Sequence, residues 1–337
     1  MFSKIIVHRV GNKINGDQLV LSSQELELEE SMKETLGDFF LKSFKSDEQF
    51  QLYSDSYLNA NPIYNAASTI FEDPSSFIEE SEKIAQHLFE ATQNPRVLPG
   101  ELFVCYFEPE EGEEGSVSKI GLFKTESLKS FMKISSEQDP FGIERDRGVG
   151  LDKLDKGCVI YNVDKEMGYA LSVIDQNKNG DEYYWFEDFL KVKQRTDAYF
   201  HTQETLSVYK EYVTKQLPQE FEVSKADQAD FLNKSISFFK DREAFDFDEF
   251  TSEVLEDKEV IESFSNFKSD YEQDRQVSIS EDFQINPSAV KKNARYFKSV
   301  IKLDKNFHIY VHGDRKMIET GQDEKGKYYR LYFENEN

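Results

Sequence analysis

The pattern of apolar and polar positions predicts that the chain begins with a hairpin and two helices. SKIIVHRV and LVLSS, separated by GNKINGDQ, show strand patterning around a turn that contains Asn15-Gly16. Over residues 25–44 the apolar residues recur every three or four positions, as in a helix packed on a core. A second helix is expected over residues 73–94, because Asp73 can cap it and Pro74 fits its first turn. Both helices are expected to cover a sheet.

Four further β-rich segments are expected to form that sheet. They are ELFVCYFE, SVSKIGLFK, KGCVIYNV and GYALSVID. The connections GEEG and DKEMG are short, so strands that they join should be antiparallel neighbours. Residues 134–157 combine Pro140 and four glycines with many charges. This composition predicts a long loop with at most one turn of helix.

After Asp181 the pattern becomes helical and then returns to strands. Helices are expected in WFEDFLKVKQ, ETLSVYKEYVTKQL, SKADQADFLNKSISFFKD and EVIESFSNFKSDYEQ, with Ser224 and Asp227 in a capping box. Strand signals follow in FKSVIKLD, NFHIYVHG and KYYRLYFE, with GQDEKGK as a turn. We therefore predict an α+β protein. It would have an N-terminal antiparallel sheet with covering helices over residues 1–182, a helical region over 183–275, and a small β-rich C-terminal unit over 276–337.

Composition adds an uneven charge to this picture. The 337 residues are 38% apolar and include 29 Phe and 17 Tyr, which is adequate for a core rich in aromatic rings. The formal net charge of −24 opposes binding to DNA or to an anionic membrane. From residue 291 onward, however, 11 Lys and Arg stand against 7 Asp and Glu, whereas the first 290 residues hold 30 against 58. The chain thus has an acidic body and a basic C-terminal segment.

The cellular environment is predicted from the cysteines and the apolar runs. Cys105 and Cys158 form no CxxC pair and lie in apolar contexts, so we expect two buried, reduced thiols. No run approaches the roughly 18 apolar residues that span a bilayer. The N-terminus MFSKIIVHRV lacks the features of a signal peptide. A cytoplasmic protein without membrane contact is expected.

DQNKNGDEYYWF resembles the opening of a calcium-binding loop. Asp175, Asn177 and Asn179 offer oxygen ligands, and Gly180 stands where such a loop turns sharply. Position twelve, which should supply a bidentate carboxylate, is Phe186, and the preceding segment reads as a strand where an EF-hand needs a helix. An Asn/Gly-rich turn is the favoured interpretation, and a weak cation site of another kind stays open.

Other candidate chemistry is sparse. His308 and the histidine four residues later lie on a predicted strand, where they would be about 13 Å apart and could not share a metal ion. RDRGVG lacks the strand and helix that flank a dinucleotide-binding turn. Arg145 and Arg147 could touch phosphates, although neighbouring acidic residues would offset them. We predict no catalytic residue, cofactor or metal site.

The most suggestive cluster is basic. It comprises Lys291, Lys292, Arg295, Lys298 and Lys302, interleaved with Tyr296 and Phe297. If Pro287 begins a short helix, four of these cations can share a face that follows a phosphate backbone. The alternative is a solvated helix whose lysines pair with the acidic body.

Several longer stretches carry a family resemblance. They are KIIVHRVGNK, KGCVIYNV with GYALSVID, YYWFEDFL, YFHTQETL, NARYFKSVIKLDKNFHIYVHG and KYYRLYFENE. Along the whole chain they resemble the bacterial nucleoid-associated protein family, often called NdpA-like. The resemblance implies a cytoplasmic protein on the nucleoid that associates with DNA and has no established enzymatic activity. It also implies that YYWFEDFL is a structural segment led by the Asn/Gly turn.

Two functions follow as hypotheses. In the first, the protein binds double-stranded DNA without sequence preference through the basic C-terminal surface, since phosphate contacts carry no sequence information. A homodimer would double that surface. In the second, the acidic body binds a basic surface on a nucleoid or DNA-processing protein, or mimics DNA for it.

Overall fold

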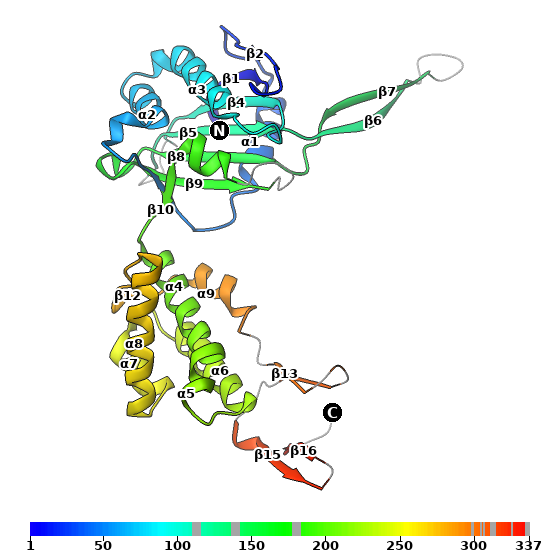
Figure 1. The fold of residues 1–337 in the computed structure, drawn as a ribbon. Helices are drawn as coiled ribbons and strands as arrows, with labels where there is room; N and C mark the ends of the chain where they lie inside the picture. Colours follow the sequence, from blue (N-terminus) through cyan, green and yellow to red (C-terminus); the bar gives the residue numbers. More distant parts are fainter. Residues whose placement is uncertain are drawn as a thin grey trace. The chain divides into compact units, whose positions relative to one another are not determined.

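The computed structural model describes residues 1–109, 116–135, 142–176, 183–297, 300–303, 305, 307–310, 315–324 and 326–333. The chain forms two compact units, residues 1–195 and residues 196–337 (Figure 1). A large antiparallel sheet dominates the first unit and helices dominate the second, which confirms the predicted α+β class.

An eight-stranded sheet forms the centre of the first unit. Its strands are β1 (Phe2–Val10), β2 (Leu19–Val20), β3 (Phe50–Leu52), β4 (Gly100–Phe107), β5 (Lys119–Thr125), β8 (Lys156–Tyr161), β9 (Ala170–Asp175) and β10 (Val192–Gln194). They follow the order β10-β3-β9-β8-β5-β4-β1-β2, and all neighbours are antiparallel. The four predicted strands are adjacent as β4-β5-β8-β9, and the predicted hairpin pairs β1 with β2 at one edge.

Helices cover both faces of this sheet. On one face lie α2 (Pro62–Glu72), α3 (Phe77–Ala91) and the π-helical turn η4 (Tyr184–Leu190), with short 3-10 turns η1 (Leu58–Ala60), η2 (Pro74–Ser76) and η3 (Lys165–Met167) nearby in the chain. On the other face, α1 (Glu30–Leu41) stacks Phe40 on Phe123 with ring centroids 4.3 Å apart. Both predicted helices are present with shorter bounds. Helix α2 was not predicted, although Asn61 caps it and Pro62 occupies its first position.

The helix predicted in WFEDFLKVKQ is present in its first part and wrong in its last part. Residues 184–190 form a π-helical turn, and residues 192–194 then pair with β3 as strand β10. Trp185 and Phe189 are fully buried in the core of the first unit. This segment therefore belongs with the sheet, because strand pairing and aromatic burial outweigh the helical pattern. Whether residues 276–337 form a domain of their own stays a prediction.

The long loop predicted over residues 134–157 is also wrong. Strands β6 (Leu128–Ser135) and β7 (Gly142–Val149) form a hairpin whose register runs from Leu128 opposite Val149 to Ser135 opposite Gly142. This hairpin extends away from the large sheet (Figure 1). The glycines and charges of this segment favour a loop in the sequence, and they obscure its strand pattern. Pro140 lies outside the described residues.

A buried network of charges joins the sheet to η4. Lys124 Nζ donates to the Leu98 carbonyl at 2.7 Å, to Glu126 Oε1 at 2.7 Å and to the Tyr184 hydroxyl at 3.0 Å. The Tyr184 hydroxyl in turn donates to Glu126 Oε1 at 2.7 Å. Burial lowers the pKa of Lys124, and the charge of Glu126 partly offsets that effect. All three ammonium donors of Lys124 are thus satisfied inside the core.

A second lysine completes this network. Lys156 Nζ lies 2.7 Å from both carboxylate oxygens of Asp175 and 3.8 Å from Glu126 Oε2. The Asp155 carboxylate accepts hydrogen bonds from the backbone amides of Glu126 and Ser127, at 2.7 and 2.9 Å. The network therefore fixes both chain segments from which the β6–β7 hairpin departs.

The candidate calcium loop is only partly described. Asn177, Asn179 and Gly180 lie outside the described residues. Asp175, its first expected ligand, ends β9 and pairs with Lys156. Among the residues that the structure describes, no group of three or more His, Cys, Asp or Glu side chains is placed to hold a metal ion.

The second unit is built around helices. They are α4 (Ala198–Glu211), the π-helical turn η5 (Tyr212–Gln216), α5 (Leu217–Glu220), α6 (Lys225–Asp241), α7 (Phe247–Val254), α8 (Lys258–Arg275) and α9 (Pro287–Ala294). Their core is aromatic, and the Tyr209 ring contacts both Phe250 and Phe264. The predicted capping box at Ser224 and Asp227 is confirmed.

Short strand pairs complete this unit. They are β11 (Ala244–Asp246) with β12 (Asp282–Gln284), β13 (Val300–Lys302) with β14 (His308–Tyr310), and β15 (Ile318–Asp323) with β16 (Gly326–Leu331); the 3-10 turn η6 (Arg315–Met317) precedes β15. The predicted strands after residue 276 are present, but residues 321–323 of the predicted turn lie within β15.

The two cysteines are free and buried, as predicted. Burial raises the pKa of both the Cys105 and the Cys158 thiols. Inside the described part of the chain, no helix has both the length and the apolar character to cross a membrane.

We predict that Glu126→Gln lowers the free energy of unfolding of the first unit by about 3–5 kcal/mol, because it leaves the buried Lys124 without its ion-pair partner. Urea denaturation followed by the fluorescence of Trp185, the single tryptophan of the chain, measures this unit. The control is Glu25→Gln, which removes a half-exposed ion pair with Lys4 and should cost less than about 1 kcal/mol. Equal losses in the two variants would contradict the prediction.

His8 gives the first unit a pH dependence. The buried ring accepts a hydrogen bond from the Ser22 amide at Nδ1 and contacts Ser81 Oγ through Nε2, which fixes a neutral tautomer. Burial lowers the pKa of His8 to about 4, against about 6.5 in an unfolded chain. Between these values the unfolded chain binds more protons than the folded one, so stability falls as pH falls.

We therefore predict that His8 contributes a loss of up to about 3 kcal/mol between pH 6.5 and pH 4. The measurement is the difference in unfolding free energy between wild type and His8→Gln across this range, since carboxylates titrate equally in both. A difference that is independent of pH would contradict the prediction.

Candidate nucleic-acid interface

The basic cluster predicted from the sequence falls on and beyond helix α9. Pro287 is the first helical residue, as expected, and the Asn286 side chain accepts a hydrogen bond from the Ala289 amide at 3.0 Å. The backbone N–H of Asn286 donates to Thr202 Oγ1 of α4 at 3.0 Å. The start of α9 is therefore fixed to α4.

One side of α9 is buried and the other carries the cations. Ala289 and Val290 are buried, and so is Phe297 three residues after the helix ends. Lys291 and Lys292, in the last turn of α9, are exposed, as is Arg295 at the C-cap. Cations at a helix C-terminus also stabilise the helix, by about 0.3–1 kcal/mol each.

Helix α4 orients these cations. Lys292 Nζ donates to the Tyr199 hydroxyl at 2.9 Å and lies 5.4 Å from the centre of its ring. Tyr296, which is 53% exposed, has the Arg295 guanidinium 4.6 Å from its ring centre. Lys210 Nζ from α4 lies 5.2 Å from the same ring. Tyr296 therefore brings cations from two helices together.

Lys210 is a member of this surface that the sequence interpretation missed. It lies on a segment correctly predicted as a helix, but 85 positions before Arg295. Nothing local indicates that α4 and α9 pack together. The contact depends on Tyr199, Thr202 and their partners on the later segment.

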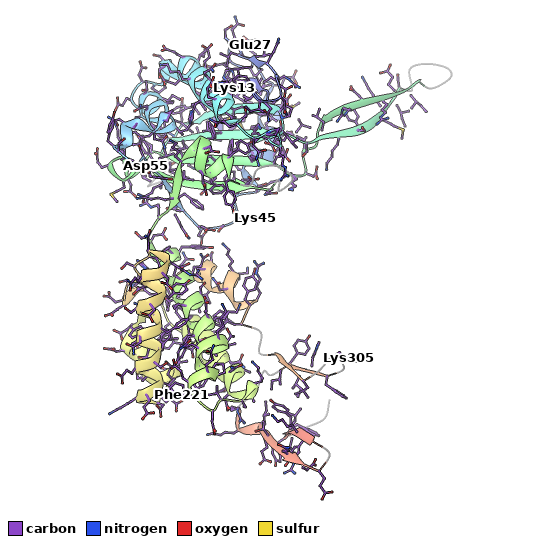
Figure 2. The ribbon with its side chains drawn as sticks, in the orientation of Figure 1. Lys13, Glu27, Lys45, Asp55, Phe221 and Lys305 are labelled. Carbon is purple, nitrogen blue, oxygen red and sulfur yellow. The ribbon has the colours of Figure 1, made fainter. Side chains whose placement is uncertain are left out.

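The structure places three of the five predicted residues in this surface. Lys298 lies outside the described residues, and Lys302 is described through its backbone, which pairs with His308 in the β13–β14 hairpin. Lys305 lies between these two strands in the chain and is exposed (Figure 2). We refer to Lys210, Lys291, Lys292 and Arg295 as the α9 surface.

Two cations of the α9 surface keep their charge unneutralised within the described part of the chain. Neither Lys291 nor Arg295 forms an ion pair with a described carboxylate. The alternative in which the lysines of this helix pair with the acidic body therefore does not apply to Lys291. Both side chains can approach an external anion without first breaking an ion pair.

A second surface of this unit has the opposite charge. A groove of about 710 Å³ lies between α8 and the segment around η5 and α5. One of its lining residues is Phe221, which is labelled in Figure 2. Its carboxylates are Glu211, Glu220, Glu259, Glu262, Asp270 and Asp274. Arg275 is the basic residue in the lining, and it pairs with Glu211. We refer to this feature as the acidic groove.

These features define a two-unit α+β protein with a small basic surface on an otherwise acidic helical unit. A family model described as nucleoid-associated protein YejK (NA37) matches residues 6–325. The chain therefore belongs to this family of nucleoid-associated proteins. No curated protein matches the chain.

Proposed function

We propose that this protein binds double-stranded DNA without sequence preference through the α9 surface. Lys291, Lys292 and Arg295 contact phosphates, and Lys298 and Lys302 extend the contact beyond the helix. In this proposal the protein acts in the cytoplasm, on the nucleoid, and catalyses no reaction. Membership of a nucleoid-associated family supports association with DNA or with proteins bound to it.

The observation that carries this proposal is the arrangement of cations around Tyr296. Arg295 and Lys210 lie against one ring, and Lys292 is held by Tyr199. Side chains that are already ordered lose less conformational entropy when they bind a phosphate. The exposed cations of α9 therefore have both the charge and the partial ordering that phosphate contact requires.

The net charge of −24 limits the affinity but does not prevent such contact. At physiological ionic strength the Debye length is about 8 Å, so acidic groups farther away are largely screened. A local basic surface can then bind phosphates on an acidic protein. The same screening makes the contact weak and dependent on salt.

We predict that changing Lys291, Lys292 and Arg295 to Gln weakens binding to a fluorescent duplex at least about tenfold at low salt. Each lost phosphate contact removes about 0.9 from the slope of log affinity against log salt, so the slope should fall by about 3. Fluorescence anisotropy across a salt series measures both quantities.

The matched control removes three cations from elsewhere on the second unit. Lys215, Lys240 and Lys258 are exposed, and changing them to Gln gives the same net charge. This variant should bind DNA nearly as well as wild type. A similar loss in both variants would indicate a response to net charge alone, and absence of wild-type binding at low salt would refute direct DNA recognition.

The acidic groove favours a second candidate function. Six carboxylates around a groove that also contains Phe221 and Phe267 suit a protein segment with both basic and apolar residues. In this proposal the protein binds a nucleoid or DNA-processing protein, and DNA association depends on that partner.

We predict that a Lys- and Phe-containing peptide binds wild type, and that changing Glu259, Glu262 and Asp270 to their amides weakens the affinity at least about tenfold. Isothermal titration calorimetry measures this affinity. Since a peptide cation also binds any acidic surface, a matched variant is required.

Glu243, Asp248 and Glu281 are exposed carboxylates outside the groove, and the control changes these three residues to their amides. It should keep wild-type affinity for the peptide. Equal weakening in the two variants would mean that the groove has no specific role.

A further inference from the structure

The β6–β7 hairpin has two chemically different faces. In an antiparallel pair, alternate residues and their cross-strand partners share a face. One face carries Leu128, Ser130, Met132 and Ile134, opposite Val149, Arg147, Arg145 and Ile143. It contains two arginines and no Lys, Asp or Glu. The other face carries Lys129, Phe131 and Lys133 with Asp146 and Glu144, so its charges balance.

The first face, which we call the arginine face, is unusually exposed for its apolar content. Met132 is 71% exposed, Ile143 is 68% exposed and Ile134 is 63% exposed. An isolated two-stranded hairpin is marginally stable in water. Protein interfaces are enriched in Met and Arg and depleted in Lys, Glu and Asp, which matches this composition. The arginine face therefore has the composition of an interface whose partner is a protein.

A groove with complementary chemistry lies on α1 of the same unit. Its volume is about 750 Å³, and Met1, Leu41 and Phe107 provide apolar lining. Glu34 and Asp38 also line it, and neither forms an ion pair with a described residue. By contrast, both lysines of the groove are already engaged, since Lys33 is paired with Glu30 and Lys42 Nζ donates to the Leu151 carbonyl. The groove thus offers apolar contacts and two available carboxylates.

The spacing of the charges matches across these two features. Glu34 and Asp38 are one helical turn apart, which is about 6 Å along the axis. Arg145 and Arg147 are two strand residues apart, which is about 6.8 Å. No residue of the hairpin lines the groove of its own unit, and the hairpin extends away from the sheet (Figure 1). The α1 groove of one copy is therefore available to the hairpin of a second copy.

We propose that two copies of this chain dimerise by exchanging hairpins, with each arginine face docked in the α1 groove of the other copy. Strands of eight residues are about 27 Å long, and a two-stranded ribbon roughly 10 Å wide presents a face of about 270 Å². One docked hairpin then buries about 540 Å² on both surfaces together. Two exchanged hairpins reach about 1,100 Å², near the lower limit for a stable interface.

The test is sedimentation equilibrium of the full chain. Wild type is expected to dimerise, and Arg145→Glu with Arg147→Glu should raise the dissociation constant at least about tenfold. The control is Lys129→Glu with Lys133→Glu, which makes the same charge change on the other face of the same hairpin and should leave the dimer intact. Circular dichroism confirms folding of each variant.

A charge swap makes the test specific. Glu34→Arg with Asp38→Arg should also weaken the dimer, and combining these changes with Arg145→Glu and Arg147→Glu should restore it. Mixing a Met132→Cys variant with a Leu41→Cys variant should give a disulfide between copies, since both natural cysteines are buried.

Three results would overturn the proposal. They are a wild type that stays monomeric at its highest soluble concentration, equal effects of the two hairpin variants, and failure of the charge swap to restore the dimer. If the arginine variant loses DNA affinity without a change in oligomeric state, the hairpin contacts DNA instead. Because the α9 surface is unchanged in all these variants, their outcome is independent of the DNA-binding proposal above.

Discussion

The first unit depends on the electrostatic compensation of two lysines in its core. Lys124 and Lys156 are almost completely buried, and such ammonium groups are tolerated only with full hydrogen bonding and nearby negative charge. Glu126 and Asp175 provide that charge, and the Tyr184 hydroxyl bridges Lys124 and Glu126. Because these groups come from β5, β8, β9 and η4, the network fixes how these elements meet. Hydrophobic burial alone would not select this arrangement so specifically.

The same network explains how an exposed hairpin can leave the sheet at a defined place. Asp155 holds the backbone of Glu126 and Ser127, and Leu128 begins the hairpin directly afterwards. A ribbon with little burial of its own needs such an anchored root. The second unit is organised differently, since aromatic packing dominates its core and places α9 against α4. A buried charge network thus anchors the hairpin in the first unit, and aromatic packing with hydrogen bonds positions α9 in the second.

Each of the two units thus carries one small basic surface on a strongly acidic chain. The α9 surface and the arginine face are both small, and each lacks an acidic residue among the members that define it. At physiological salt, interactions between exposed charges extend about 8 Å, so surfaces of this size can act independently of the net charge. Membership of a nucleoid-associated family is compatible with an acidic protein on this basis.

Local chemistry in the sequence determined the fold class, the β4-β5-β8-β9 core of the sheet, the capping box at Ser224 and the start of α9 at Pro287, because these depend on periodicity and on residues a few positions apart. It also determined the contrast between an acidic body and a basic C-terminal segment. Only the tertiary structure decided that residues 128–149 form a hairpin, that Trp185 joins the sheet, and that Lys210 lies beside Tyr296. These features depend on contacts between residues distant in the chain, which a linear pattern does not specify.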